Sequence, residues 1–513
     1  MKSPYNYKYL ILLSFWLILI FANFGSAFAQ LHQPERAEVT LKGGENYFTV
    51  INAKENGLIL IREGKRSRDR KSVWEVIKYD TSLHQEWRTE LLLDISFEFT
   101  GYEYRNNNGY FLFHMSPYRS DKMAIVVMDL ATQEIEQFEA EYAFPLQITE
   151  FTVVGNAAIL GGYANYMPAV VHFDFSSKKI KVLRGIYSNR SELVEVSVDE
   201  KQQILNVIVT ERTYDKRTTL AIKTFDKDGE LLQNTRLKTK GENNILFGKS
   251  TKFHAEKQFI AGTYANRKSK YSNGIFIAEL DKSGKQDITY ISYGDLKNFF
   301  SYMKTKREAR VRSRINKRKT LGKRSKIHYK LLVNDIIEKD DKYILFGEAF
   351  YPKYSTQYSY INAATAPRYG NRSGGQYFEG YKYTHAVVIA FNKEGKVLWD
   401  NSFEINDVTS YNLEQYVHAS IEEERAVLLY QFENKIRSKI IKEDEIIEGK
   451  TTKDIATKFA ADEAKENNYD IGGLELWYDK YFYAYGVQKI KNLKDGGAKL
   501  NRKVFYINKI YYE

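Results

Sequence analysis

Cysteine is absent from the 513-residue sequence, and proline is scarce, at seven residues. The lack of cysteine excludes thiol nucleophiles, thiolate metal sites and a fold held by disulfides, and a chain of this length can be stable without such cross-links. Tyrosine (40) and phenylalanine (30) are abundant instead. Because aromatic and β-branched residues favour half-buried pleated surfaces, the composition predicts an all-β globular protein.

Local catalytic signatures are absent as well. The eight histidines are scattered without an HxxxH, HxH or HExxH pairing, and neither GxSxG nor GxGxxG occurs. Gly248-Lys249-Ser250 looks like the end of a phosphate-binding loop, but Asn243 stands where that motif needs glycine. His385 and His418 are expected to pack at strand ends. The sequence therefore indicates no metal and no cofactor, and it favours a protein that is not an enzyme.

The first 29 residues have the features of a secretory signal peptide. Two lysines precede a nearly unbroken apolar run at 10–22, and the AFA triplet at 27–29 forms a small-x-small cleavage site before Gln30. An uncleaved anchor is the alternative, because the apolar stretch at 9–29 is nearly long enough to span a membrane. The cleavage site favours removal, which predicts an exported protein that is periplasmic, secreted or at the cell surface.

A short repeat organises the rest of the chain. Each copy combines an apolar strand with a turn that begins at Asp or Asn, whose side chain can accept hydrogen bonds from the backbone two residues on. An apolar triplet, often closed by glycine, lies upstream of each turn. The turns are Tyr79-Asp80, Met128-Asp129, Phe173-Asp174, Phe225-Asp226, Leu280-Asp281, Phe391-Asn392 and Ile507-Asn508, with a further one expected near Glu443-Asp444.

The spacing of this repeat predicts a β-propeller. The first five turns are 45 to 55 residues apart, and units of about 40–50 residues that each form a small meander are typical of propeller blades. Eight upstream triplets predict eight blades, or seven if two units merge, in one domain covering 30–513. Since the chain ends five residues after Asn508, an isolated strand at 36–42 is expected to complete the last blade and close the ring.

Three inserts interrupt the repeat. Residues 295–326 carry apolar side chains at helical spacing among basic ones. Residues 451–467 begin with a threonine N-cap followed by Asp454, which predicts a second helix. The third insert, at 350–383, is rich in tyrosine and glycine. One or two helical inserts are therefore expected in an otherwise all-β fold.

The tyrosine-rich insert is the first candidate binding site. Tyrosine offers a flat apolar face and a hydroxyl at low entropic cost, which suits peptides or sugar rings. A loop without a ligand is the alternative. The candidate ligand-binding residues are Tyr351, Tyr354, Tyr358, Tyr360, Tyr369, Tyr377, Tyr381 and Tyr383.

A basic segment is the second candidate. Thirteen Lys and Arg residues and one acid, Glu308, lie between 304 and 330, a surplus equal to the net charge of +12 of the whole chain. Export and the scarcity of interleaved aromatics argue against nucleic acid. An envelope protein, an anionic envelope polymer or a lipid surface is expected to bind instead, and a solvated helix is the alternative. The candidate residues are Lys304, Lys306, Arg307, Arg310, Arg312, Arg314, Lys317, Arg318, Lys319, Lys323 and Arg324.

Two resemblances extend this interpretation. The stretch FNKEGKVLWDNSF at 391–403 resembles the repeat of PQQ-type eight-bladed propellers, in which a tryptophan docks each blade onto its neighbour. This resemblance implies the architecture and no cofactor site. The AFAQ junction at 27–30 and the phrases YTHAVVIAFN, WYDKYFYAYG and KVFYINKI resemble exported proteins of Bacteroidota bacteria with no assigned activity.

Together these features predict an exported, non-catalytic binding or scaffold protein of the cell envelope, monomeric or part of a complex, that acts through loops on one propeller face. A propeller enzyme, hydrolase or lyase, that acts on glycans or peptides is the alternative. A ligand or metal in the central channel, beside converging carboxylates from several blades, would favour the enzyme. A clean apolar channel, with function confined to the two long inserts that flank the sixth blade, would favour the scaffold.

Overall fold

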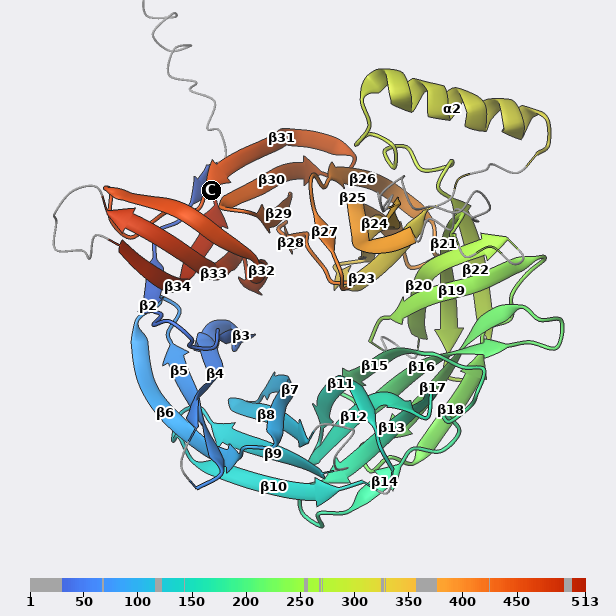
Figure 1. The fold of residues 1–513 in the computed structure, drawn as a ribbon. Coiled ribbons are helices and arrows are strands. Elements are labelled where there is room, and N and C mark those ends of the chain that lie inside the picture. The colour runs from blue at the N-terminus through green and yellow to red at the C-terminus, as the bar shows by residue number, and fades with distance from the viewer. Residues whose placement is uncertain are drawn as a thin grey trace, which may run out of the picture.

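Eight separate antiparallel sheets, each of four or five strands, form a ring in the computed structural model of the protein (Figure 1). The sheets follow one another in chain order, so the ring is a β-propeller of eight blades, as the repeat predicts. The structure describes residues 30–66, 69–115, 122–142, 144–252, 257–266, 269, 271–323, 327, 329–356, 376–423, 425–492 and 501–513.

The first four blades are regular four-stranded meanders. Blade one contains β3 (Thr49–Asn52), β4 (Leu58–Arg66), β5 (Lys71–Tyr79) and β6 (Gln85–Asp94), with a short 3-10 helix, η1 (Lys54–Asn56), between its first two strands. Blade two contains β7 (Phe97–Arg105), β8 (Asn108–Met115), β9 (Lys122–Asp129) and β10 (Ile135–Glu141). Blade three contains β11 (Gln147–Val154), β12 (Ala157–Ala164), β13 (Met167–Asp174) and β14 (Ile180–Val182). Blade four contains β15 (Leu193–Asp199), β16 (Ile204–Arg212), β17 (Thr218–Asp226) and β18 (Leu231–Arg236).

The last four blades carry the departures from this pattern. Blade five contains β19 (Asn243–Ser250), β20 (Lys257–Asn266), β21 (Gly274–Asp281) and β22 (Gln286–Ser292). Blade six contains β23 (Lys330–Lys339), β24 (Lys342–Thr356), β25 (Gln376–Asn392), β26 (Val397–Glu404) and the short β27 (Thr409–Ser410). Blade seven contains β28 (His418–Ile421), β29 (Ala426–Phe432), β30 (Lys435–Lys442) and β31 (Glu445–Asp454). Blade eight contains β32 (Asp462–Tyr478), β33 (Tyr481–Asn492) and β34 (Asn501–Tyr512), joined by β1 (Leu31–His32) and β2 (Arg36–Thr40).

Six of the predicted turns connect the third and fourth strands of a blade, and the turn expected near Glu443-Asp444 does the same in blade seven. The turns contain the side-chain-to-backbone hydrogen bonds that the sequence predicts. The carboxylate of Asp80 accepts hydrogen bonds from the backbone N–H of Ser82 (2.9 Å) and His84 (2.8 Å). In the blade-four turn Asp226 plays the same part, and Gly229 adopts a φ of 75°.

The N-terminal strand closes the ring, as predicted. β2 pairs antiparallel with β34 from Arg36↔Asn508 to Thr40↔Val504, and β1 extends the pairing near the C-terminus. The turn predicted at Ile507-Asn508 is wrong, because both residues lie inside β34. The fourth strand of blade eight comes from the other end of the chain, so no turn is needed there. The Asn508 amide instead donates to Gln33 Oε1 (3.1 Å) and to a blade-seven carbonyl.

One helical insert is present and one is not. The insert at 295–326 contains α2 (Thr305–Thr320), which confirms a helix there. The helix predicted at 451–467 is wrong: the stretch is the end of β31, a turn and the start of β32. Strand pairing overrides the local capping pattern, since β31 remains paired with β30 as far as Asp454 and β32 pairs with β33 from Asp462.

The core consists of apolar clusters, several of which join neighbouring blades. In one of them Trp74 of blade one packs edge-on against Phe113 of blade two, at 5.0 Å between ring centroids. Such contacts stabilise each blade through the next one, which is the physical basis of the ring. None of the helices in the described part of the chain has the length and apolarity needed to cross a membrane.

Candidate ligand-binding site at blades six to eight

The tyrosine-rich insert of blade six forms the outer part of a long hairpin. β24 and β25 pair from Lys342↔Asn392 out to Thr356↔Gln376, so the hairpin extends well past the other strands of the blade. Tyr351 and Tyr354 are 43% and 54% exposed near its end, and Phe378 packs on Tyr354 at 5.6 Å. The backbone of Tyr377 lies in β25. Tyr358, Tyr360 and Tyr369 lie outside the described residues.

The base of this hairpin holds the segment that leads into blade seven. β27 pairs with β25 through Tyr381↔Ser410, and Gly380 (φ 118°) permits the crossing because a Cβ there would lie 2.8 Å from the Ser410 carbonyl. Tyr383 is buried, and its hydroxyl donates to the carbonyl of Glu414 (2.8 Å) and accepts from the N–H of the same residue (3.0 Å). Tyr383 therefore positions residues 410–416 and is not free to bind a ligand.

Below the hairpin lies a pocket of about 630 Å³ built from blades six, seven and eight. The chain entering blade seven forms one wall, the β29–β30 turn forms the second, and the first two strands of blade eight form the third. A volume of this size suits one or two residues of a peptide or one or two sugar rings. The residues lining the pocket are Val408, Thr409, Ser410, Tyr411, Asn412, Glu414, Gln415, Tyr416, His418, Gln431, Phe432, Glu433, Gly472, Gly473, Leu474, Glu475 and Tyr485.

The lining is acidic. It contains the carboxylates of Glu414, Glu433 and Glu475, and no lysine or arginine belongs to it among the residues that the structure describes. Burial lowers the pKa of His418 to about 4, so this imidazole is neutral at physiological pH and adds no positive charge. The pocket therefore presents negative charge, tyrosine rings and hydrogen-bond acceptors to a ligand.

Glu475 is the most unusual of these carboxylates. It accepts hydrogen bonds from the hydroxyls of Tyr483 and Tyr485, the latter at 3.4 Å. Burial raises the pKa of Glu475, and the two hydroxyls counteract that effect only in part. Burial also raises the pKa of Tyr485, so this side chain stays a neutral donor. Glu475 is therefore the group of this pair that can take up and release a proton at the pocket wall.

A buried glutamate supports the pocket from behind. Glu348 of β24 accepts hydrogen bonds from the backbone N–H of Val417 (2.6 Å) and Tyr416 (3.0 Å), and from the Asn334 amide (3.2 Å). Burial raises its pKa to about 7 despite these donors. Glu348 fixes the start of blade seven, while Tyr383 holds the residues just before it. Both contacts come from the two long strands of the blade-six hairpin.

The sequence points to the tyrosine-rich insert but predicts neither its hairpin form nor the pocket. Glu475 faces Tyr483 across β32 and β33, and Tyr485 follows two residues later on the same face. The stretch LELWYDKYFYAYG carries the signal, because a two-residue turn at Asp479-Lys480 would bring these side chains together. The interpretation of His385 as a packed residue is confirmed: it is fully buried and stacks on Tyr302 at 3.8 Å.

The basic segment lies away from this pocket. Arg312 and Lys319 connect α2 to the segment before it: Arg312 donates to the Leu296 carbonyl (3.4 Å), and Lys319 pairs with Asp295 (2.9 Å). Arg312 also pairs with Glu308 (2.8 Å) within the helix. Arg318 is half-buried. Arg324 lies outside the described residues. The other candidates are exposed; they are Lys304, Lys306, Arg307, Arg310, Arg314, Lys317 and Lys323.

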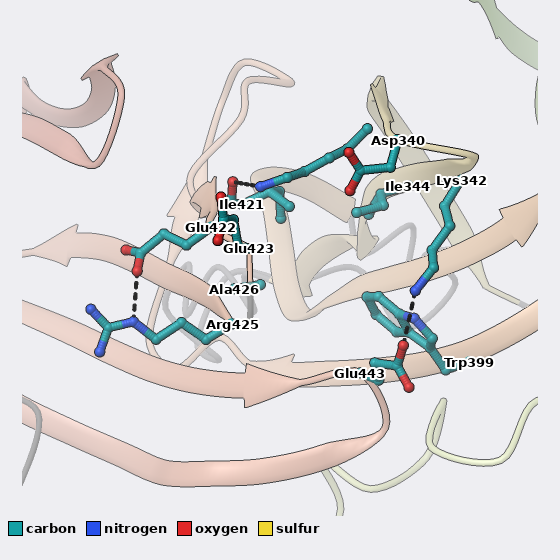
Figure 2. A pocket seen from close by; sticks show the side chains of 11 residues that line it. Asp340, Lys342, Ile344, Trp399, Ile421, Glu422, Glu423, Arg425, Ala426 and Glu443 are labelled. Atoms are coloured by element: carbon teal, nitrogen blue, oxygen red, sulfur yellow. Dashed lines mark hydrogen bonds and ion pairs between the residues drawn. The ribbon is translucent and has the colours of Figure 1, made fainter.

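A smaller pocket, of about 80 Å³, lies at the other end of the strands between blades six and seven (Figure 2). Ala426, at the start of β29, lines it, whereas Phe432 at the end of β29 lines the larger pocket. Trp399 packs here, with its indole N–H buried and without a partner among the described residues. The charged groups mostly neutralise one another, which leaves little to attract a ligand. Lys342 pairs with Glu443 (3.0 Å), Arg425 pairs with Glu422 (2.7 Å), and Lys339 donates to the Ile421 carbonyl (2.7 Å).

Two motif-level expectations concern metals and phosphate. Across the residues that the structure describes, no group of three or more His, Asp or Glu side chains is placed to hold a metal ion. Gly248-Lys249-Ser250 lies within β19, where Lys249 pairs with Glu195 (3.5 Å) and Ser250 donates to the same carboxylate. These residues therefore link blades four and five and form no phosphate loop.

Comparison with known proteins shows similarity in fold. No family model matches the chain, and no curated protein matches it. The β-propeller domain of the Trilobed protease from Pyrococcus furiosus is 9% identical, with a TM-score of 0.35 over 80% of this chain and 93% of that one. Polysaccharide lyase Uly1 is 9% identical, with a TM-score of 0.38 over 91% and 99%. The acylaminoacyl peptidase of Pyrococcus horikoshii is 10% identical, with a TM-score of 0.35 over 78% of this chain and 53% of the peptidase. At these identities the similarity concerns the β-propeller architecture alone.

Proposed function

We propose that the protein is an exported binding protein that uses the blade six-to-eight pocket and the adjoining hairpin to hold a peptide segment of a partner. The observation that carries this proposal is the acidic pocket: in the described part of the chain, three carboxylates and neither lysine nor arginine line a concave site of about 630 Å³. Exposed Tyr351, Tyr354 and Tyr411 add aromatic surface beside it. Export rests on the features of residues 1–29.

The charge of the pocket selects the class of ligand. A lysine or arginine side chain entering it would meet Glu414, Glu433 and Glu475, and charge-assisted hydrogen bonds to carboxylates are stronger than neutral ones. An acidic peptide or an acidic glycan would be repelled. The tyrosine rings would pack against the apolar stem of such a side chain. We therefore infer that the preferred ligand is an extended peptide that carries a basic residue.

Fluorescence anisotropy with labelled hexapeptides tests this function. The probes are hexalysine, hexaglutamate and a neutral glycine-serine hexamer, each titrated with the mature chain at several salt concentrations. We expect hexalysine alone to bind, and the Glu433→Gln, Glu475→Gln double variant to weaken its binding at least tenfold, since hydrogen bonds to charged groups contribute about 1.5–3 kcal/mol each. The matched control is the Glu422→Gln, Glu443→Gln double variant, which removes two charges from the small pocket at the other end of the strands. Equal affinities for hexalysine in the two double variants would contradict the proposal.

Catalysis at the same pocket is the second candidate, and Glu475 is the observation in its favour. A carboxyl group with a raised pKa beside a tyrosine hydroxyl can act as a general acid or base. A hydrolase or lyase acting on peptides or glycans would use it to protonate a leaving group or to remove a proton. Mass spectrometry of peptide and oligosaccharide mixtures incubated with the wild type and with Glu475→Gln distinguishes the two functions. Products formed by the wild type and not by Glu475→Gln would replace the binding function with an enzymatic one.

A further inference from the structure

The helix α2 is attached to the propeller by one side only. Its buried residue is Ile315, which packs with Phe299 and Phe300 in the cluster shared by blades five and six. Val311, one turn earlier, is partly buried against the same cluster. Figure 1 shows α2 outside the ring of blades, beside blades five and six. The opposite side of the helix therefore faces away from the propeller.

Basic residues occupy that opposite side. At about 100° per residue, Lys306, Arg310, Arg314 and Lys317 fall within about 80° of one another and 100–180° from Ile315. All four are exposed, and no ion pair of theirs is found in the described part of the chain. Arg307 lies at the edge of the same arc and is exposed as well. We call these five residues the α2 stripe; it is straight and about 16 Å long.

We propose that the α2 stripe docks the protein onto an anionic lipid surface. The apolar face of α2 is already used against the propeller, so the helix cannot insert into a bilayer, and the attraction is electrostatic. A convex, straight row of positive charge at the periphery of the molecule can approach a flat anionic surface without a clash. A flexible polymer is more often held in a groove that tracks its backbone, and α2 presents a ridge. This docking is independent of the acidic pocket and of export.

The basic residues predicted to bind a partner fall into two groups in the structure. Arg312 and Lys319 belong to the attachment, because Arg312 donates to the Leu296 carbonyl (3.4 Å) and Lys319 pairs with Asp295 (2.9 Å), both of which lie before the helix. Arg312 also packs its guanidinium on Phe300, 5.5 Å from the ring centroid. These side chains are occupied with holding the helix. The α2 stripe, in contrast, has charge to offer a partner.

Co-sedimentation with large vesicles tests the proposal. The mature chain is mixed with phosphatidylcholine vesicles, with and without 30% phosphatidylglycerol, between 50 and 500 mM salt. We expect binding only to the anionic vesicles and a loss of binding with rising salt. Each basic residue near such a surface strengthens binding about fivefold. The triple variant Lys306→Gln, Arg310→Gln, Arg314→Gln should therefore bind about 100-fold more weakly.

The matched control removes the same charge elsewhere. Lys201→Gln, Lys238→Gln, Lys435→Gln neutralises three exposed lysines on blades four, five and seven, and it should bind nearly as the wild type does. Since every substituted residue is exposed, both triple variants should keep the wild-type melting temperature. Equal losses of vesicle binding in the two triple variants would mean that net charge alone causes the binding, and this result would overturn the proposal. So would stripe-dependent binding to soluble polygalacturonate together with no binding to anionic vesicles.

Discussion

Replacing Arg36 with alanine tests how the ring is closed. Arg36 lies at the start of β2, with only 6% of its side chain exposed. Its guanidinium pairs with Glu38 (2.7 Å) and donates to three acceptors from blades seven and eight. The acceptors are the Ala456 carbonyl, Asn508 Oδ1 and Gln488 Oε1, each at 2.8 Å. The same group lies 4.7 Å from the ring centroid of Tyr506.

The expected loss can be worked out contact by contact. Glu38 keeps Arg502 as a partner, and the Ala456 carbonyl keeps the Asn508 amide, so neither is left unpaired. The side-chain oxygens of Asn508 and Gln488 lose their donor, at about 1–3 kcal/mol each. The contact with Tyr506 adds about 1 kcal/mol. Burial lowers the pKa of Arg36, so desolvation of its charge opposes these gains. A net loss of about 3 kcal/mol follows.

The assay is thermal unfolding of the mature chain followed by circular dichroism. An unfolding entropy of about 2.1 cal/mol/K per residue, summed over roughly 480 residues, converts 3 kcal/mol into a fall in Tm of about 3 °C. Hydrogen exchange should rise in β2 and in the facing residues of β34, because local opening becomes easier. Lys42→Ala, an exposed neighbour, is the control and should change Tm by less than about 0.5 °C. A Tm for Arg36→Ala within 1 °C of the wild type, with unchanged exchange in β34, would refute this account of closure.

Three further predictions concern buried polar groups. Burial raises the pKa of Glu348 to about 7, so the folded state binds an extra proton between pH 4.5 and 7. The free energy of unfolding should therefore fall as pH rises through that range, and urea titrations should show a smaller fall for Glu348→Gln. Burial lowers the pKa of His385 to about 3, so the folded state holds this ring neutral and stability should fall as pH drops below 6.5; the same titrations should show a weaker acid effect in His385→Phe. Asp400 accepts from the N–H groups of Lys297 and Asn298, both at 2.7 Å, so Asp400→Asn should cost about 1–2 kcal/mol and raise hydrogen exchange at 295–303.

The blade repeat could be predicted because its turns depend on local chemistry. Asp80 and Asp226 bond the backbone within their own turns, so their spacing is visible in the sequence. Closure by the N-terminal strand could be predicted because the last unit is too short. The Asn508 turn and the helix at 451–467 could not be excluded locally. Asn508 is in a strand because it pairs with Arg36 from the other end of the chain. The stretch 451–467 is extended because its two ends pair with residues outside it, at 435–438 and at 488–492.

The candidate site could likewise be predicted only in part from the sequence. The insert at 350–383 could be found from composition alone, since its tyrosines lie within one short stretch. That its described ends continue β24 and β25 as paired strands could not be predicted, because no turn signal within it stands out. The pocket beneath it takes Glu414, Glu433 and Glu475 from three separate places in blades six to eight. No spacing rule connects these residues, because blade-to-blade distances depend on how the sheets pack and not on the chain between them. A single sequence therefore identifies the tyrosine-rich insert and does not identify the acidic pocket.

The geometry of blade six also indicates how the hairpin and the pocket act together. The segment that forms the pocket wall, 410–417, is held by Tyr383 from β25 and by Glu348 from β24. Both residues belong to the two strands of the hairpin, and the outer end of β24 carries Tyr351 and Tyr354. A ligand that contacts the outer hairpin and tilts it would therefore move the pocket wall, because packed strands shift as units. Tyr383→Phe removes the hydroxyl that joins β25 to the wall, so it should lower the affinity of the pocket for hexalysine while leaving the charge of its lining unchanged.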